Sequence, residues 1–230
     1  MIVLRDQMLV IIQARMSSAR LPGKVLREIA GSPILQRVYD RVLSARNVKR
    51  AVVATSTDHS DLKIRNFCES RGIPVFSGSL RNVAKRLLNC AIEEGEEAFV
   101  RISADSPLID PLLIDKAIEI YKTTKCDLVS NVQTRSFPKG QSVEVIKLSA
   151  FKNLVNCLTR PEEQEHVTTY FYQNTKKYKI KNFSVHNDSS HLQLSVDTKE
   201  DFEKISKILN VVADNSSWKD AAHTYQVMFR

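Results

Sequence analysis

The sequence lacks the patterns that most readily identify nucleotide and metal chemistry. Its 230 residues contain neither a Gly-x-Gly-x-x-Gly fingerprint nor a Gly-x-x-x-x-Gly-Lys-Ser/Thr loop, which argues against ordinary P-loop chemistry. The four cysteines are widely separated and form no Cys-x-x-Cys pair. This spacing favours reduced core residues over a zinc site or a disulfide framework. These cysteines are Cys68, Cys90, Cys126 and Cys157.

Long hydrophobic runs are also missing. No apolar stretch approaches the roughly 18 residues that span a bilayer. Arg5 and Asp6 interrupt the N-terminal region where a signal peptide would need an apolar segment. The regular pattern starts at Met8, so we expect Met1–Gln7 to precede the fold. These absences predict a cytoplasmic protein without a membrane partner.

Acidic residues are outnumbered by basic ones, and the formal net charge is +8 with a pI near 9.3. Such a balance favours an anionic partner, either nucleic acid or a nucleoside triphosphate with an acidic sugar. The lysines and arginines are scattered, with no long basic run and no interleaved aromatic residues. This distribution weakens the nucleic-acid alternative, and we expect no nucleic-acid partner.

The first half of the chain alternates short β-branched runs with amphipathic segments, which predicts a parallel sheet with crossover helices on both faces. Expected strands are residues 9–12, 51–55, 73–76, 98–102 and 127–130, and expected helices are residues 33–45, 58–70, 81–94 and 111–122. The fold class is therefore α/β, Rossmann-like and mainly parallel. With 43% hydrophobic residues, the chain suits one such domain over residues 1–230.

The second half is less regular. A strand at 142–146 and helices at 150–158 and 162–172 are expected, followed by two segments, 179–185 and 192–196, that alternate like antiparallel strands. We place a small antiparallel insertion at about residues 132–192. Thr198 is expected to cap one final long helix, with Asp201 completing a capping box.

A basic loop follows the first strand. It carries three cations, two serines and a Pro-Gly pair that no helix can run through. In open α/β sheets ligands bind at this carboxyl edge, and such a loop suits a polyphosphate. A merely solvated basic loop is about equally compatible with the composition. The polar members of the loop are Arg15, Ser17, Ser18, Arg20 and Lys24, and we expect Lys24 to be exposed.

Two aspartates follow predicted strands at the same edge. Asp105 comes just after residues 98–102, and Asp197 comes after residues 192–196. Either could cap the next helix, but Asp110 and Thr198 suit that role better. Two free carboxylates beside a polyphosphate could share one Mg²⁺, which prefers hard oxygen ligands.

Other polar positions follow strand ends. Thr55, Ser56 and Gly78 lie where a nucleotide base could be held, and ordinary turns explain them equally well. Asn131 and Arg135 could meet a sugar carboxylate, Arg135 through a bidentate fork.

The order of these residues resembles the sugar cytidylyltransferases, the family of the 3-deoxy-manno-octulosonate and acylneuraminate enzymes. Residues 14–24 resemble the signature Ala-Arg-x-x-Ser-x-Arg-Leu-Pro-Gly-Lys, and Gln-Ala-Arg-Met at 13–16 resembles the spore-coat-polysaccharide-type branch. Residues 101–111 resemble Arg-Ile-x-x-Asp-x-Pro-Leu-Ile-Asp-Pro, and residues 196–201 resemble Val-Asp-Thr-x-x-Asp. Residues 165–168 resemble a Glu-His-Val-Thr motif of the same branch.

The resemblance implies a homodimeric, Mg²⁺-dependent enzyme with a nucleotide-diphospho-sugar transferase type of fold. It would transfer CMP from CTP to an acidic sugar of nonulosonic-acid type, for cell-surface polysaccharide synthesis. Two alternatives stay open: a nucleotide-binding paralogue without transferase activity, and a glycosyltransferase on a similar fold.

The resemblance and the strand-end positions together assign the site residues. The catalytic set is Arg15, Lys24 and Asp105. The nucleotide-binding set is Ala14, Arg15, Ser18, Arg20, Lys24, Thr55, Ser56, Gly78 and Ser103. The acceptor-binding set is Asn131, Arg135, Arg160 and His166, and the metal ligands are Asp105 and Asp197.

Overall fold

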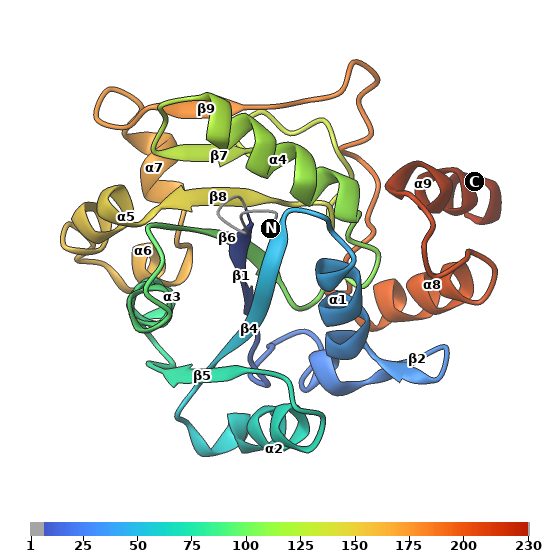
Figure 1. Cartoon of the computed structure of the whole chain (residues 1–230). Coiled ribbons are helices and arrows are strands. Elements are labelled where there is room, and N and C mark those ends of the chain that lie inside the picture. The colour runs from blue at the N-terminus through green and yellow to red at the C-terminus, as the bar shows by residue number, and fades with distance from the viewer. Residues whose placement is uncertain (1–6, 230) are drawn as a thin grey trace, which may run out of the picture.

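Within residues 7–229 the central element is a seven-stranded sheet in which only one strand, β8, runs against the others. The computed structural model describes residues 7–229 (Figure 1), so the segment expected before the fold lies outside them except for Gln7. The strands, in their order across the sheet, are β5 (Val75–Gly78), β4 (Val48–Ser56), β1 (Met8–Gln13), β6 (Ala98–Ser103), β8 (Glu144–Lys147), β7 (Leu128–Ser130) and β9 (Ile180–Asn182). The predicted α/β class and mainly parallel sheet are confirmed.

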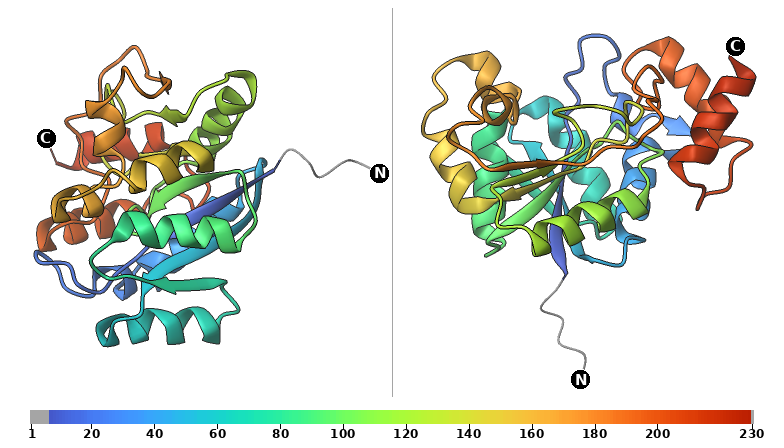
Figure 2. Two further views of the ribbon diagram at one scale, coloured as in Figure 1. Left: turned by 90° about the vertical axis from the view of Figure 1, so that its left-hand side faces the viewer. Right: turned by 90° about the horizontal axis from the view of Figure 1, so that it is seen from above.

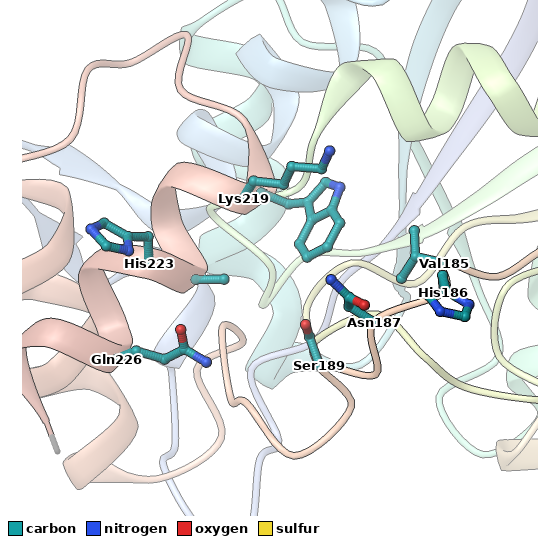
Figure 3. A pocket seen from close by; sticks show the side chains of 9 residues that line it. Val185, His186, Asn187, Ser189, Lys219, His223 and Gln226 are labelled. Atoms are coloured by element: carbon teal, nitrogen blue, oxygen red, sulfur yellow. The ribbon is translucent and has the colours of Figure 1, made fainter.

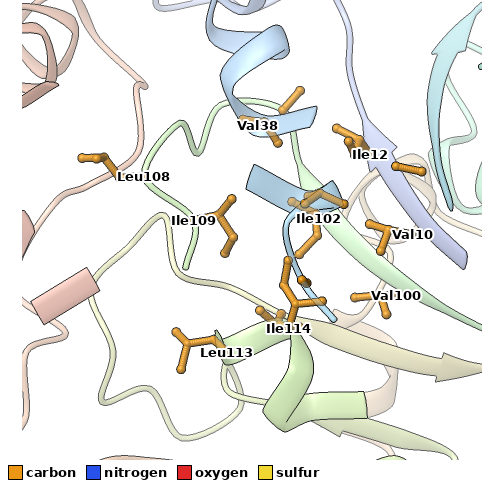
Figure 4. Packing of buried hydrophobic residues seen from close by; sticks show 14 of the residues in the cluster. Val10, Ile12, Val38, Val100, Ile102, Leu108, Ile109, Leu113 and Ile114 are labelled. Atoms are coloured by element: carbon orange, nitrogen blue, oxygen red, sulfur yellow. The ribbon is translucent and has the colours of Figure 1, made fainter. Parts of the chain in front are cut away.

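Both faces of the sheet are covered because the central strands are apolar on both sides. In β1, Val10 and Ile12 face one core, whereas Leu9 and Ile11 face the other, and all four are fully buried. This double burial is typical of parallel sheets with crossover helices. Figure 4 shows Val10 and Ile12 packed with residues of β6 and α4 in the first core.

The helices divide between the two faces. The first core is covered by α1 (Ile34–Leu43), α2 (Leu62–Ser70), α4 (Pro111–Thr123), α8 (Lys199–Leu209) and α9 (Trp218–Met228). The other side carries α3 (Val83–Glu93), α5 (Leu148–Val155), α6 (Pro161–Glu165) and α7 (Thr169–Gln173). Figures 1 and 2 show the sheet between these two groups. A separate small hairpin pairs β2 (Glu28–Ile29) with β3 (Ser32–Pro33).

Two helix starts were predicted correctly, and both matter for the site. The Asp110 side chain accepts from the Leu112 N–H and caps α4. Thr198 and Asp201 form the expected capping box at the start of α8. Because these residues provide the caps, Asp105 and Asp197 are free for another role.

The predicted helix over residues 162–172 is wrong. The chain forms α6 and α7 instead, separated by a turn at residues 166–168. Val167 in this turn is fully buried against the second core. His166 ends α6 because its φ of −90° and ψ of 64° lie outside the helical conformation, and Thr169 starts α7 after the turn.

The antiparallel interpretation of the later strands is also wrong. Strand β9 pairs in parallel with β7, and residues 192–196 form no strand but one parallel bridge, between Lys139 and Gln193. The antiparallel strand is β8, which inserts into the main sheet. The final long helix is two helices, α8 and α9. Cys157 is exposed, unlike the other three cysteines, so the core prediction fails for it.

Gly140 allows residues 138–142 to pack closely against the segment that precedes Asp197. Gly140 has a φ of +93°, and a Cβ there would lie 2.6 Å from the carbonyl carbon of Leu194. Beside it, the Lys139 N–H donates to the Leu192 carbonyl at 2.9 Å, and the Leu194 N–H donates to the Lys139 carbonyl at 2.8 Å. Residues 138–142 therefore pack directly against the backbone of residues 192–195.

We expect Gly140→Ala to lower the free energy of unfolding by more than about 2 kcal/mol, through backbone strain and displacement of Leu194. Gly95→Ala is the matched control, because Gly95 has a φ of +70° but no atom within 4 Å of its added Cβ. The control should cost about 1 kcal/mol, from strain alone. Urea denaturation measures both, and equal losses would show that the close approach at Gly140 contributes nothing.

Candidate active site

The site lies at the carboxyl ends of β1 and β6, where the basic loop and the segment before α8 meet. The Ala104 N–H donates to the Gln13 carbonyl at 3.0 Å, and the Val196 N–H donates to the Asp105 carbonyl at 2.8 Å. These backbone bonds place Asp105 and Asp197 side by side although 91 positions separate them in the numbering. The expected meeting of the two aspartates at one sheet edge is confirmed.

Lys24 lies between these carboxylates. Its ammonium is 2.7 Å from Oδ2 of Asp105 and 2.9 Å from Oδ1 of Asp197, and it donates to the Val196 carbonyl at 2.7 Å. Lys24 is only 8% exposed, so the expectation of an exposed lysine was wrong. Asp105 and Asp197 are not unpaired either: they share one ammonium, which reduces the repulsion between the two adjacent carboxylates.

Burial opposes ionisation of Asp197, but the hydrogen bond and charge of Lys24 outweigh it. With smaller contributions from Arg20 and Gln193, they hold the pKa of Asp197 below its ordinary range. Arg20 is 3.2 Å from Asp197 and largely exposed. Asp197 is therefore ionised near neutral pH and remains an anionic ligand for any cation that enters the site.

Arg15 is paired as well. Its guanidinium lies 2.5 Å from Oε1 of Glu165, at the end of α6. Both side chains are more than a third exposed, so the pair is screened by solvent and weak. An incoming phosphate could therefore take Arg15 from Glu165 at small cost.

A pocket of about 350 Å³ opens among these charges. It brings together eight of the residues assigned from the sequence, namely Arg15, Ser18, Arg20, Lys24, Ser103, Asp105, His166 and Asp197. We call it the nucleotide pocket.

A second pocket, of about 440 Å³, adjoins the first and is here called the acceptor pocket. Among its lining residues are Arg101, Arg135, Lys139, Ser142 and Glu144. Four residues line both pockets: Ser103, Asp105, His166 and Asp197. A group bound in one pocket would thus contact a group bound in the other beside the two aspartates.

Buried charges form the floor of the acceptor pocket. Glu144 is 2% exposed, pairs with Arg101 and accepts a hydrogen bond from the Tyr172 hydroxyl. Burial and this carboxylate raise the pKa of Tyr172, so the phenol stays protonated and donates. Arg135 donates to Ser142 Oγ at 3.1 Å through one nitrogen, whereas its buried Nη1 has no partner in the described residues. Arg135 therefore has a donor available for an acceptor molecule.

Several assigned residues lie outside both pockets. Thr55 and Ser56 are fully buried, and the Ser56 hydroxyl donates to Asp61. Asn131 is also fully buried, with its amide bonded to the main chain of Gln141 and Val143, so it braces this segment and does not face an acceptor.

Three more assigned residues are absent from the pocket linings. Ala14 is 2% exposed, and Gly78 packs against the side chain of Arg86. Arg160 forms an ion pair with Glu163 in the capping box of α6, with 2.6 Å between Nη2 and Oε1.

Sequence reasoning missed two buried polar residues that shape the site. Asp61 accepts from the Met16 N–H at 2.7 Å and from the Ser56 N–H at 3.1 Å, which anchors the basic loop to β4. Gln141 donates to the Leu108 carbonyl at 2.6 Å and accepts from the Asp110 N–H at 2.9 Å, which joins the acceptor pocket to the loop that carries Asp105. Asp61 lies within the helix that we expected over residues 58–70. The hydrophobic periodicity of that segment does not indicate that this aspartate is buried.

A larger cavity of about 520 Å³ lies apart from this site, between α9 and residues 185–189. Figure 3 shows Lys219, His223 and Gln226 of α9 on one side of it and His186 on the other. None of the residues assigned from the sequence lines it. Within residues 7–229, no helix combines the length and apolar character needed to cross a membrane.

Replacing Lys24 by methionine tests the charge balance. Lys24→Met leaves two carboxylates without their cation, and we expect the free energy of unfolding to fall by about 1–3 kcal/mol. Mg²⁺ should then stabilise the variant more than the wild type, because the metal no longer competes with an ammonium. Thermal unfolding with and without Mg²⁺ measures this difference.

The control is Lys49→Met, which removes an exposed ion pair with Glu96, 3.1 Å away. This variant should unfold close to wild type and respond to Mg²⁺ as the wild type does. Equal stabilisation of Lys24→Met and wild type by Mg²⁺ would contradict a shared cation site.

Comparison of the chain with known proteins identifies its family. The cytidylyltransferase family matches residues 9–226. The spore coat polysaccharide biosynthesis protein SpsF of Bacillus subtilis is 29% identical over 210 residues, covering 88% of this chain and 86% of that protein. The 3-deoxy-manno-octulosonate cytidylyltransferase of Geobacter sulfurreducens is 41% identical over 108 residues, 47% of this chain and 42% of that enzyme.

A solved structure agrees over almost the whole fold. The structure of a cytidylyltransferase from Leptospira borgpetersenii is 28% identical, superposes with a TM-score of 0.90, and covers 96% of this chain and 94% of its own. The match runs through both sequence halves and includes every strand that supports the two pockets. The chain belongs to the cytidylyltransferase family, and it is a nucleotidyltransferase.

Proposed function

We propose that this protein transfers the CMP group of CTP to an acidic sugar of nonulosonic-acid type, with Mg²⁺ as cofactor. The observation that carries the proposal is the pair of adjoining pockets that meet at Asp105 and Asp197. One pocket is lined by the cations that a triphosphate needs, and the other has an arginine with an unused donor. The products would be a CMP-sugar for cell-surface polysaccharide synthesis and pyrophosphate.

The residues present fit a magnesium ion. Asp105 and Asp197 already direct one oxygen each at a single cation, the Lys24 ammonium. Mg²⁺ prefers such hard oxygen ligands and commonly takes one or two carboxylates, with phosphate oxygens and water as the rest. Within residues 7–229 no group of three or more His, Cys, Asp and Glu suited to a metal occurs, so phosphate oxygens and water would have to supply the remaining ligands. When bound, it would neutralise charge on the phosphates and orient them.

The chain's own cations supply the other charges in the nucleotide pocket. Arg15 and Arg20 are exposed enough to turn from their carboxylate partners to phosphate oxygens. Lys24 contacts both carboxylates, and its ammonium would turn to phosphate oxygens when Mg²⁺ takes its place between them. Ser18 can donate from the same loop. These contacts would hold the triphosphate and stabilise the departing pyrophosphate.

The acceptor pocket suits a polyhydroxylated anion. Arg135 can hold a carboxylate, with Lys139 as a second cation on the same wall. Burial lowers the pKa of Arg135, and the nearby Glu144 charge offsets this only in part, but an arginine stays charged at neutral pH even with a lowered pKa. Glu144 can accept from a sugar hydroxyl. An oxygen of the sugar would then attack the α-phosphorus of CTP at the boundary of the two pockets.

Pyrophosphate release tests the proposal. Wild-type protein with CTP, Mg²⁺ and a panel of acidic sugars should release pyrophosphate and form a CMP-sugar. Asp105→Asn and Asp197→Asn should each reduce turnover by roughly 100-fold or more, because each removes a ligand to the same cation. The double variant should be little worse than either single one, since the two act as a unit.

Asp214→Asn is the matched control for these variants. The Asp214 side chain is 91% exposed and lines neither the nucleotide pocket nor the acceptor pocket. Within residues 7–229 its only ion pair is with Arg37. It should leave turnover unchanged. If CTP and Mg²⁺ stabilise the wild type but no acidic sugar yields pyrophosphate, the proposed transfer to an acidic sugar is wrong.

Arg135 allows a separate test of the acceptor. Arg135→Ala should raise the KM for the acid sugar by roughly 10- to 100-fold, the loss expected for one charge-assisted contact. The KM for CTP should not change, because Arg135 lines only the acceptor pocket. Arg160→Ala is the control, since Arg160 pairs with Glu163 outside both pockets. An equal effect of both variants on the sugar KM would place the acceptor elsewhere.

A further inference from the structure

His166 occupies the boundary between the two pockets. It lines both of them, together with Ser103, Asp105 and Asp197. Its main chain is fixed, because its N–H donates to the Glu162 carbonyl at 2.9 Å and its carbonyl accepts from the Thr169 N–H at 3.0 Å. Its imidazole is exposed and makes no hydrogen bond or ion pair with residues 7–229. The backbone therefore holds an uncommitted imidazole at the place where the two substrates would meet.

The other candidates for proton transfer at this boundary are committed. The acidic side chains that line the acceptor pocket are each paired with a cation, and these are Asp105, Asp197 and Glu144. Glu165, which Arg15 would release on binding phosphate, lines only the nucleotide pocket and does not reach the boundary. The cations that face the two pockets are Arg15, Arg20, Lys24, Arg101, Arg135 and Lys139. None of these arginines and lysines is a proton acceptor while charged. Neutral imidazole is the usual acceptor of a proton near neutral pH.

This inference rests on the proposed function, which requires a sugar hydroxyl to lose its proton. We propose that His166 is the general base that removes this proton as the sugar oxygen attacks the α-phosphorus of CTP. A bond forms between that oxygen and the α-phosphorus, and the bond from the α-phosphorus to the bridging oxygen breaks. Pyrophosphate leaves with the bonding electron pair. The proton is held on the imidazole and passes to water, because the side chain is open to solvent.

The test compares His166→Ala, His166→Gln and the control His223→Ala, using full-length protein, CTP, Mg²⁺ and the best acidic sugar. His223 lies on α9 in the separate cavity of Figure 3 and takes no part in the site. At pH 7 the kcat of both His166 variants should fall roughly 100-fold or more, with little change in the KM for CTP. Added imidazole should restore part of the activity of His166→Ala, and His223→Ala should match the wild type.

The pH profile separates proton transfer from positioning. In the wild type, kcat/KM should fall on the acid side of neutrality as a base becomes protonated, and both His166 variants should lose this limb. Turnover within about fivefold of wild type with an unchanged limb would overturn the inference. A raised KM for CTP with unchanged kcat would also overturn it, because His166 would then bind phosphate. Wild-type protein that releases no pyrophosphate with any acidic sugar contradicts the proposed function itself.

Discussion

The site depends on a balance between one ammonium and two carboxylates. Asp105 and Asp197 are brought together by backbone hydrogen bonds, and their repulsion must be offset by a cation. Lys24 supplies it because Gly23, with a φ of +70°, turns the loop so that the lysine enters the site and does not point to solvent. The protein can thus fold with both carboxylates in place. This arrangement preorganises the site and avoids ordering it at the moment of reaction.

A side-chain amide and a close backbone approach couple the acceptor pocket to the same pair of aspartates. Gln141 bonds to the loop after Asp105, and Gly140 lies against the backbone just before Asp197. A displacement of residues 138–142 therefore moves both carboxylates. The Gln141 side chain is fully buried, and its amide satisfies two backbone groups, the Leu108 carbonyl and the Asp110 N–H. The amide at this position holds the backbone together, whereas Lys139 and Ser142 line the acceptor pocket.

The sequence predicted most of the parallel core because hydrophobic periodicity carries that information directly. Asp110 and Thr198 were identified as caps from their positions before helices, and this made Asp105 and Asp197 stand out. Pairing partners carry no such local signal. The parallel pairing of β9 with β7 depends on residues about 50 positions apart, and the burial of Lys24 depends on contacts with residues more than 80 positions away. Polar strand-end residues such as Asn131 matched a ligand-binding pattern but satisfy backbone groups instead.

Ligand binding at this site is an exchange of partners. Each cation already forms an ion pair: Arg15 with Glu165, Lys24 with both aspartates, and Arg101 with Glu144. Each incoming anion must compete with an internal carboxylate, so the net free energy of each new contact is smaller than its strength in isolation. The exposed pair of Arg15 and Glu165 is the easiest to exchange, whereas the buried pair of Arg101 and Glu144 is the hardest. The nucleotide pocket can therefore rearrange its charges on binding while the floor of the acceptor pocket stays fixed.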